Sequence, residues 1–136
     1  MRKIEEIIIH CSATRPDQHI GVEEIRKWHV EERGWSDCGY HYVIKRNGVI
    51  EKGRSIKDVG AHTKGYNKSS VGVCMVGGLD AQNAPRSNYT ASQWYSLYSL
   101  VNFLTITFDE AEVLGHNDLS KKDCPCFDVR QWWYDL

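Results

Sequence analysis

The chain has 136 residues, and its 17 Lys and Arg residues against 18 Asp and Glu residues leave a formal net charge of −1. This length corresponds to a single domain, which we expect to cover residues 1–136. The charge balance excludes the strong basic field that draws nucleic acid or an anionic membrane, so we expect neither as a partner. Hydrophobic residues at 41% and charged residues at 26% exclude an intrinsically disordered chain.

No targeting segment is expected at the N-terminus. Glu5 and Glu6 interrupt the apolar stretch that a signal peptide requires, and the run Ile7–Ile9 is far shorter than the about 20 residues of a transmembrane helix. We therefore expect a protein that is cytoplasmic as synthesised. The five Cys residues are an odd number without the close spacing of a disulfide framework, which favours reduced thiols and one metal ligand.

The first part of the chain predicts a strand followed by a helix. Residues 4–10 form an Ile-rich run that ends in His10 and lacks clean alternation, which is typical of a strand buried on both faces. An apolar stripe then predicts a helix over residues 21–32, and Gly34 ends it. The stripe consists of Val22, Ile25 and Trp28, with His29 beside them.

The middle of the chain predicts a β-hairpin and a further strand. The runs 40–46 and 49–52 are strand-like and flank Asn47 and Gly48, the dipeptide that most strongly signals a hairpin turn. Residues 71–76 form another β-branched, apolar run. We therefore expect three strands between residues 40 and 76.

A long helix and a short strand follow. Thr90 and Gln93 have the spacing of a capping box, which predicts the start of a helix over residues 91–104. We expect the apolar stripe of this helix in the core: Trp94, Leu97, Tyr98, Val101 and Leu104. Residues 111–115 predict a last strand, which ends at His116.

The C-terminal residues predict one more helix. Asp128 and Gln131 repeat the capping-box spacing before Trp132 and Trp133. Strands and helices therefore alternate along the chain. We expect an α/β fold, a single domain with a central mixed β-sheet flanked by about three helices.

Two histidines and a cysteine form a candidate metal site. His10 and His116 each stand where a predicted strand ends, and sites in open α/β sheets gather at the carboxyl ends of strands. Cys124 follows His116 in the run KKDCPCFD. Neutral imidazole and thiolate are zinc ligands, and three protein ligands with an open position are the catalytic arrangement. Spacing alone leaves structural His and Cys residues as the alternative, and the H-E-x-x-H and P-C-x-x-C motifs are absent.

The residues around these positions resemble a known family. The chain carries, in order, IIIHCSAT, GVEEIRKWH, GYHYVIKRNGVIEKGR, VGAHTKGYNKSSVGVCMVGG and GH followed by KKDCPCFD. This order resembles the zinc-dependent N-acetylmuramoyl-L-alanine amidases, in particular the short bacteriophage lysozyme-type members. The family shares its fold with the peptidoglycan recognition proteins. The resemblance covers nearly the whole chain.

The resemblance implies a substrate, a cofactor and a set of site residues. The family cleaves the amide between the lactyl group of N-acetylmuramic acid and L-alanine in bacterial peptidoglycan, and it uses one zinc ion per chain. By this resemblance His10, His116 and Cys124 match the zinc ligands, and Tyr40 and Lys122 match the catalytic residues. The implied role is cell-wall lysis by a phage or prophage endolysin that reaches the wall after holin-type release.

Physical chemistry separates the roles of Tyr40 and Lys122. An unperturbed tyrosine titrates near pH 10, so Tyr40 suits the orientation of a water and the shuttling of a proton better than the role of a free strong base. The charge of Lys122 can stabilise a tetrahedral oxyanion. Without the resemblance, Tyr40 could equally be an aromatic residue that packs on the sheet.

The remaining histidines, one asparagine and a second cysteine are further candidates for the site. His62 and Asn67 lie in the loop AHTKGYN, which the resemblance brings near the cleft, so they are candidates for substrate contact; the alternative is a loop that packs on its own turns. We expect His41 and His29 to be structural. Cys126 is a rival metal ligand beside Cys124, but the relatives compared carry Ser at that position.

Three alternatives to a zinc amidase remain at this stage. The first is a non-hydrolytic peptidoglycan-binding module, and the second is a metal-independent hydrolase with Cys124 as nucleophile. The third is an inhibitor of transcription, because a phage relative binds and inhibits its RNA polymerase through a longer N-terminal segment. Only a few residues precede the first predicted strand here, so this partnership is not carried over from the resemblance, and inhibition of RNA polymerase stays an open alternative. We expect a monomer.

Overall fold

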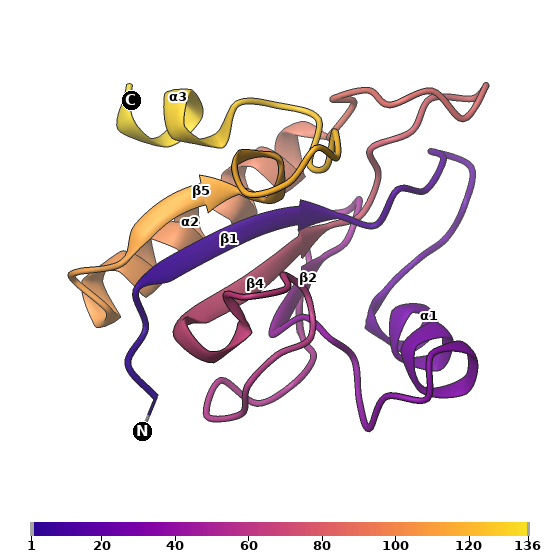
Figure 1. Cartoon of the computed structure of the whole chain (residues 1–136). Helices are drawn as coiled ribbons and strands as arrows, with labels where there is room; N and C mark the ends of the chain where they lie inside the picture. The colour runs from indigo at the N-terminus through magenta and orange to yellow at the C-terminus, as the bar shows by residue number, and fades with distance from the viewer. Residues whose placement is uncertain (1, 136) are drawn as a thin grey trace.

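Five strands form one mixed sheet in the computed structural model, which describes residues 2–135 (Figure 1). The strand order is β3-β2-β4-β1-β5. Strands β1, β2, β4 and β5 are parallel, and only the edge strand β3 runs antiparallel to its neighbour β2. The strands span Glu6–Cys11 (β1), Tyr42–Ile44 (β2), Ile50–Lys52 (β3), Ser70–Met75 (β4) and Glu112–Gly115 (β5). The expected α/β class with a central mixed sheet is confirmed.

Helices cover both faces of this sheet (Figure 1). The α-helices span Val22–Lys27 (α1), Ala91–Thr107 (α2) and Val129–Tyr134 (α3), and a π-helical turn, Trp28–Glu32 (η1), continues α1. Two short 3-10 helices, Asn67–Ser69 (η2) and His116–Asp118 (η3), lie next to β4 and β5. None of the helices within residues 2–135 is long and apolar enough to cross a membrane.

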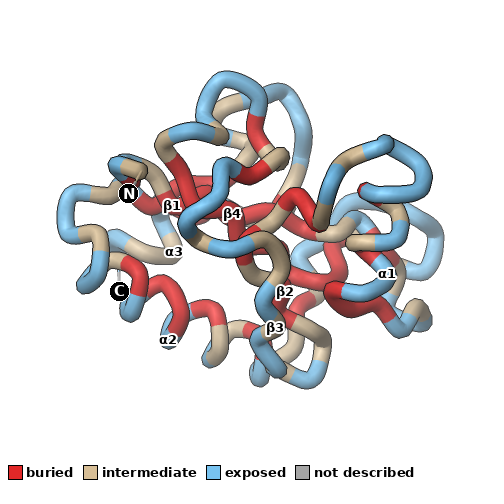
Figure 2. Tube along the Cα trace, turned by 90° about the horizontal axis from the view of Figure 1, so that it is seen from below, coloured by how far each residue is buried: buried red, intermediate tan, exposed pale blue. Residues whose placement is uncertain are grey.

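Two clusters of buried side chains pack against the sheet, and the first of them contains alternate residues of β1. Ile7 and Ile9 pack with α2 residues such as Leu97 in one cluster, while Ile25 of α1 packs with Val43 and neighbouring residues in the other. Ile7, Ile8 and Ile9 are fully buried. The buried centre of the sheet is visible along β1 and β4 in Figure 2. A strand covered on both faces needs no polar alternation, which is why its sequence is continuously apolar.

The predicted hairpin forms, with a loop of three residues. The backbone N–H of Lys45 donates to the carbonyl oxygen of Val49 at 2.9 Å, and the N–H of Gly48 donates to the carbonyl oxygen of Lys45 at 2.8 Å. Gly48 has a φ of 88°, a left-handed conformation that glycine adopts at little cost. The loop is therefore a turn whose last residue is left-handed, one of the common hairpin connections.

The predicted capping box forms completely at the start of α2 and only in part at the start of α3. In α2 the Thr90 side chain accepts from the Gln93 N–H at 3.1 Å, and the Gln93 side chain accepts from the Thr90 N–H at 3.0 Å, which completes a capping box. In α3 Asp128 accepts from the Gln131 N–H at 3.1 Å, but the return bond of a capping box is not formed. The N-cap of α3 is therefore only half of the expected motif.

Several expected boundaries and positions were wrong. The helix expected over residues 21–32 changes to a π-helical turn at Trp28, because a stripe this short cannot distinguish α from π geometry. Helix α2 runs three residues beyond the expected 104, to Thr107. Tyr98 of the expected core stripe is 46% exposed, since it packs at the rim against Trp133, with ring centroids 5.8 Å apart.

Candidate metal centre and cleft

The fold brings His10, His116 and Cys124 together at the carboxyl end of the parallel strands. His10 is the fifth residue of β1, His116 directly follows β5, and Cys124 lies in the loop before α3. One ligand atom from each residue lies within 4.8 Å of the others. The adjacent parallel pairing of β1 and β5 explains this convergence, because both strands end at the same edge of the sheet.

The opposite side of the His10 ring is held by the protein. His10 Nε2 lies 2.9 Å from His62 Nδ1 and 3.2 Å from Thr63 Oγ1, which leaves Nδ1 for a ligand. Burial lowers the pKa of His10 well below its usual value, and the neighbouring His62 and His116 lower it further. Burial and the charge of Lys122 also lower the pKa of His116. Both imidazoles are therefore neutral at neutral pH, the form that binds metal ions.

The two neighbouring cysteines have different surroundings. The Cys11 backbone N–H donates to Cys124 Sγ at 3.1 Å, and this sulfur faces the two imidazoles. The Cys126 thiol instead faces the carbonyl oxygen of Gly78 at 3.4 Å, and burial raises the pKa of Cys126 to about 11. Cys126 is absent from the group of converging ligand atoms. The donor set of His10, His116 and Cys124 fits zinc, which prefers nitrogen and sulfur ligands.

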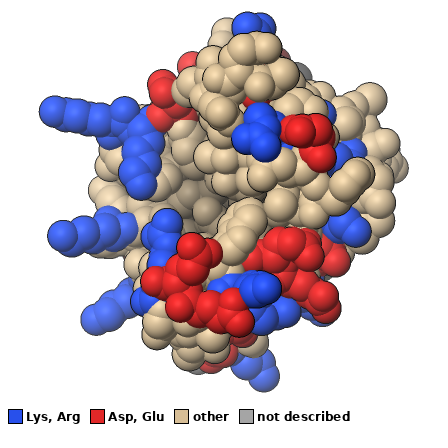
Figure 3. Space-filling model, turned by 90° about the vertical axis from the view of Figure 1, so that its right-hand side faces the viewer, with Lys and Arg blue, Asp and Glu red and all other residues tan. Residues whose placement is uncertain are grey.

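A hollow of about 240 Å³ lies beside the converging ligands and contains both expected catalytic residues. Tyr40 lines it, with its ring centroid 5.2 Å from that of His10, and Lys122 lines it with an exposed side chain. Burial raises the pKa of Tyr40 well above its usual value, so the hydroxyl keeps its proton. Figure 3 shows a hollow among uncharged atoms on the side of the molecule that carries α1, with basic side chains along one margin.

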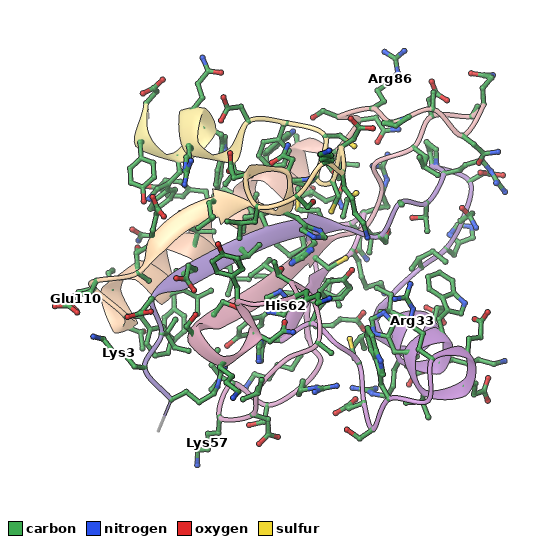
Figure 4. The ribbon with its side chains drawn as sticks, in the orientation of Figure 1. Lys3, Arg33, Lys57, His62, Arg86 and Glu110 are labelled. Carbon is green, nitrogen blue, oxygen red and sulfur yellow. The ribbon has the colours of Figure 1, made fainter. Side chains whose placement is uncertain are left out.

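The loop that holds His62 and Asn67 lies beside this cleft. His62 is partly buried among the central strands, where Figure 4 labels it, and it touches the ring of His10. The Asn67 side-chain oxygen accepts from the N–H groups of His62 and Thr63, both at 2.9 Å. Asn67 thus orders the loop, and His62 supports His10. A substrate contact by either side chain stays a prediction.

The remaining buried histidines hold backbone groups, as expected. His29 Nδ1 accepts from the Gly39 N–H at 2.8 Å, and His41 Nδ1 accepts from the Gly72 N–H at 3.0 Å. Sequence reasoning missed Thr63 beside His10, and it missed Arg33 and Trp35, which line the cleft. Their only sequence signal was proximity to the end of a helix and to the AHTKGYN loop.

Comparisons with known proteins agree with this geometry. The family model for N-acetylmuramoyl-L-alanine amidase matches residues 1–127. The endolysin of Enterobacteria phage T3 is 48% identical over 129 residues, which cover 95% of this chain and 85% of that protein.

Solved structures of similar fold include bacterial and insect proteins. The endolysin amidase LysCS from Clostridium intestinale has a TM-score of 0.79 at 27% identity, covering 91% of this chain and 76% of that one. Drosophila PGRP-LB has a TM-score of 0.80 at 23% identity, covering 98% and 82%, and supports the fold alone. From the match over nearly the whole chain we conclude that this protein belongs to the N-acetylmuramoyl-L-alanine amidase family.

Proposed function

We propose that this protein is a zinc-dependent amidase that cleaves the bond between N-acetylmuramic acid and L-alanine in bacterial peptidoglycan, as an endolysin. The observation that carries the proposal is the convergence of His10, His116 and Cys124 beside an open cleft. Membership of the amidase family and the endolysin from phage T3 support the substrate class and the action on cell walls. We further propose that the enzyme acts as a monomer.

Zinc is the cofactor that the three ligands suit, with one ion per chain. When bound, zinc supplies a Lewis acid that polarises the scissile carbonyl and lowers the pKa of a water. His10 enters such a site already oriented, because His62 and Thr63 hold the far side of its ring. Support of this kind around a metal ligand keeps its geometry and basicity constant.

Two side chains of the cleft supply the remaining chemistry. The protonated Tyr40 hydroxyl orients the attacking water and passes a proton on, since its raised pKa makes it a poor free base. Lys122 places a positive charge beside His10 and His116, where the carbonyl oxygen gains negative charge in the transition state. Neither side chain belongs to the group of converging ligand atoms.

The bond specificity can be tested with purified cell walls. Digestion should release new amino termini on alanine and no new reducing sugar ends. New reducing ends would mark a glycosidase, and wall binding without any release would mark a peptidoglycan-binding module.

The metal can be tested on the same preparation. Elemental analysis should find one zinc per chain after refolding with metal. Chelation should abolish release and lower the Tm, because a ligand that binds only the native state adds about 4 kcal/mol at a thousandfold excess over its Kd. Hydrolysis that persists after chelation and is stopped by a thiol reagent would instead favour Cys124 as nucleophile.

A further inference from the structure

Arg2 joins three segments of the chain that are distant in sequence. Its Nη1 contacts the carbonyl oxygens of Asn67 and Lys68, both at 3.2 Å, and that of Ser70 at 3.0 Å. Its Nη2 donates to the carbonyl oxygen of Ile56 at 2.9 Å. Because β1 and β4 are parallel neighbours, the segment before β1 meets the segment before β4 at one edge of the sheet. A guanidinium is always charged in proteins, and its fork of donors can fix several carbonyl groups at once.

The 3-10 helix η2 is fixed to the start of β1 by further hydrogen bonds. The Glu5 backbone N–H donates to the Ser69 carbonyl oxygen at 2.7 Å, and Ser69 Oγ donates to Glu6 Oε1 at 2.6 Å. Carbonyl oxygens at the end of a helix lack partners within it and favour a nearby positive charge. Arg2 supplies that charge, so it completes the attachment of η2 to the segment before β1.

Asn67 connects this attachment to the loop beside the metal ligands. Its backbone carbonyl oxygen contacts Arg2, and its side-chain oxygen accepts from the N–H groups of His62 and Thr63, both at 2.9 Å. His62 Nδ1 and Thr63 Oγ1 in turn lie 2.9 and 3.2 Å from His10 Nε2. An unbroken series of polar contacts therefore runs from Arg2 to the ring of a candidate metal ligand.

A second route from Arg2 to His62 runs through β4. A Cβ atom at Gly72 would lie 2.6 Å from the His62 ring, so this ring packs directly on the backbone of the strand. His62 Nε2 also lies 3.3 Å from Ser70 Oγ, and the Ser70 carbonyl oxygen is one of those that Arg2 contacts. A shift of η2 would therefore displace both the Asn67 amide and the Ser70 hydroxyl relative to His62.

We propose that Arg2 is a positioning residue for the metal centre, which anchors η2 so that Asn67 and His62 keep the His10 ring oriented toward the ion. This inference rests on the zinc site of the proposed function. Arg2 does not line the cleft, so it acts only through other residues. Loss of a group directly behind a metal ligand costs about 10–100-fold in metal affinity. For the more distant Arg2 we expect the lower end of that range, about tenfold.

The test measures the zinc affinity of the folded protein by competition with a chromophoric chelator. Arg2→Gln removes the charge and the fork of donors, and the Kd for zinc should rise about tenfold. Arg2→Lys should give a smaller rise, because an ammonium still reaches a carbonyl oxygen. At saturating zinc, Arg2→Gln should lower kcat on a muropeptide and leave KM unchanged, since Arg2 does not line the cleft.

Lys3 provides a matched control, and Asn67 tests the route. Lys3→Gln removes the same charge from the next residue, whose exposed side chain, labelled in Figure 4, pairs only with exposed Glu5 at 3.7 Å. This variant should leave the zinc Kd unchanged. Asn67→Ala alone should weaken zinc binding, and Arg2→Gln should have a smaller effect in that background than in the wild type. Fully additive effects would contradict a route through Asn67.

The outcomes separate positioning from stability. An unchanged zinc Kd in Arg2→Gln, even with a lower Tm, would mark a purely structural residue and overturn the proposal. An equal rise of the Kd in Lys3→Gln would attribute the effect to general charge and overturn it as well. If Arg2→Gln does not fold, the comparison of Arg2→Lys with Lys3→Gln decides by the same criterion. A wild-type protein that binds no zinc would instead overturn the proposed function itself.

Discussion

Cys124 and Cys126 are two residues apart and chemically identical, yet only Cys124 is placed to bind a metal. Cys124 Sγ receives the Cys11 N–H and converges with two imidazoles, whereas Cys126 contacts the Gly78 carbonyl oxygen and has its pKa raised to about 11 by burial. Cys124 is therefore placed to bind a metal together with the two imidazoles, and Cys126 is not.

The cysteine assignment predicts unequal effects of the same substitution. Cys124→Ser should lose zinc, because a neutral hydroxyl is a far poorer ligand than a thiolate. Cys126→Ser should retain zinc and most of the activity. Zinc content by elemental analysis and wall lysis should be measured for both variants. A reversed pattern, with zinc lost from Cys126→Ser, would contradict the ligand assignment.

Tyr40 is expected to act on the reaction without holding the metal. Tyr40→Phe removes only the hydroxyl, so zinc content and Tm should stay at the wild-type level. The rate of amide hydrolysis should fall by about 10²–10⁴-fold, the usual worth of a general acid–base group. Near-wild-type turnover in a zinc-loaded Tyr40→Phe variant would remove Tyr40 from the mechanism while leaving the amidase assignment intact.

Lys122 has a neighbour that serves as its control. Lys122→Ala removes the charge beside His10 and His116, and the rate should fall by about 10²–10³-fold with zinc retained. Lys121→Ala removes the same charge from the adjacent exposed residue, which does not line the cleft. Equal losses in the two variants, measured as kcat/KM on a muropeptide, would point to general electrostatics instead of oxyanion stabilisation.

At the scale of elements, one buried glutamine joins α2 to the sheet. The side chain of Gln93 is fully buried, and its Nε2 donates to the carbonyl oxygens of Val76 at 2.8 Å and Ile44 at 3.3 Å. Its Oε1 accepts from the Thr90 N–H, so every group of the amide is used. This residue therefore both caps the helix and satisfies backbone groups next to the ends of β2 and β4.

Because Gln93 joins α2 to the sheet, we expect its substitution to lower the stability of the fold. Gln93→Leu removes the Gln93 donor to the buried Val76 carbonyl oxygen and the acceptor of the Thr90 N–H, which should reduce the free energy of unfolding by about 2–3 kcal/mol in urea titrations. Gln131→Leu changes the corresponding N3 position of α3, where the side chain is exposed, and should cost less than about 0.5 kcal/mol. Both variants should bind zinc when folded. Equal costs would contradict the role of Gln93 as a buried connection.

For the whole molecule, buried neutral histidines predict sensitivity to acid. Burial first, and the charges of Arg33 and Arg54 second, lower the pKa of His29 to about 4, against about 6.5 in an unfolded chain. The unfolded state therefore binds more protons between these values, so stability is complete above about pH 6.5 and falls as the pH drops toward 4. His41 shifts in the same direction, mainly through burial.

The contribution of His29 can be isolated with one substitution. His29→Asn offers a carbonyl oxygen to the Gly39 N–H that His29 Nδ1 now accepts, but it cannot be protonated. The loss of unfolding free energy between pH 7 and pH 4.5 should be smaller in this variant than in the wild type, by about 1–2 kcal/mol. Urea titrations at both pH values measure the difference. Identical losses would show that His29 is not an acid-sensitive group.

Local patterns in the sequence were sufficient for much of the fold. The Ile-rich run of β1, the Asn47-Gly48 hairpin and the capping box at Thr90 each depend on neighbours within a few residues, so their signals are readable in the sequence. The π-helical turn at Trp28 and the exposure of Tyr98 were not predictable, because packing partners elsewhere in the chain decide them.

The sequence also indicated part of the candidate site, and the tertiary structure decided the rest. The sequence by itself determined which residue types could bind a metal, and the resemblance selected His10, His116 and Cys124 among them. Only the tertiary structure decided that these ligands converge, that Cys126 contacts Gly78 instead, and that Arg33 lines the same cleft. The physical reason is that β1 and β5 are adjacent in the sheet although more than one hundred residues separate His10 from His116. Side-chain pairing across such separations depends on the packed sheet and has no local signature in the chain.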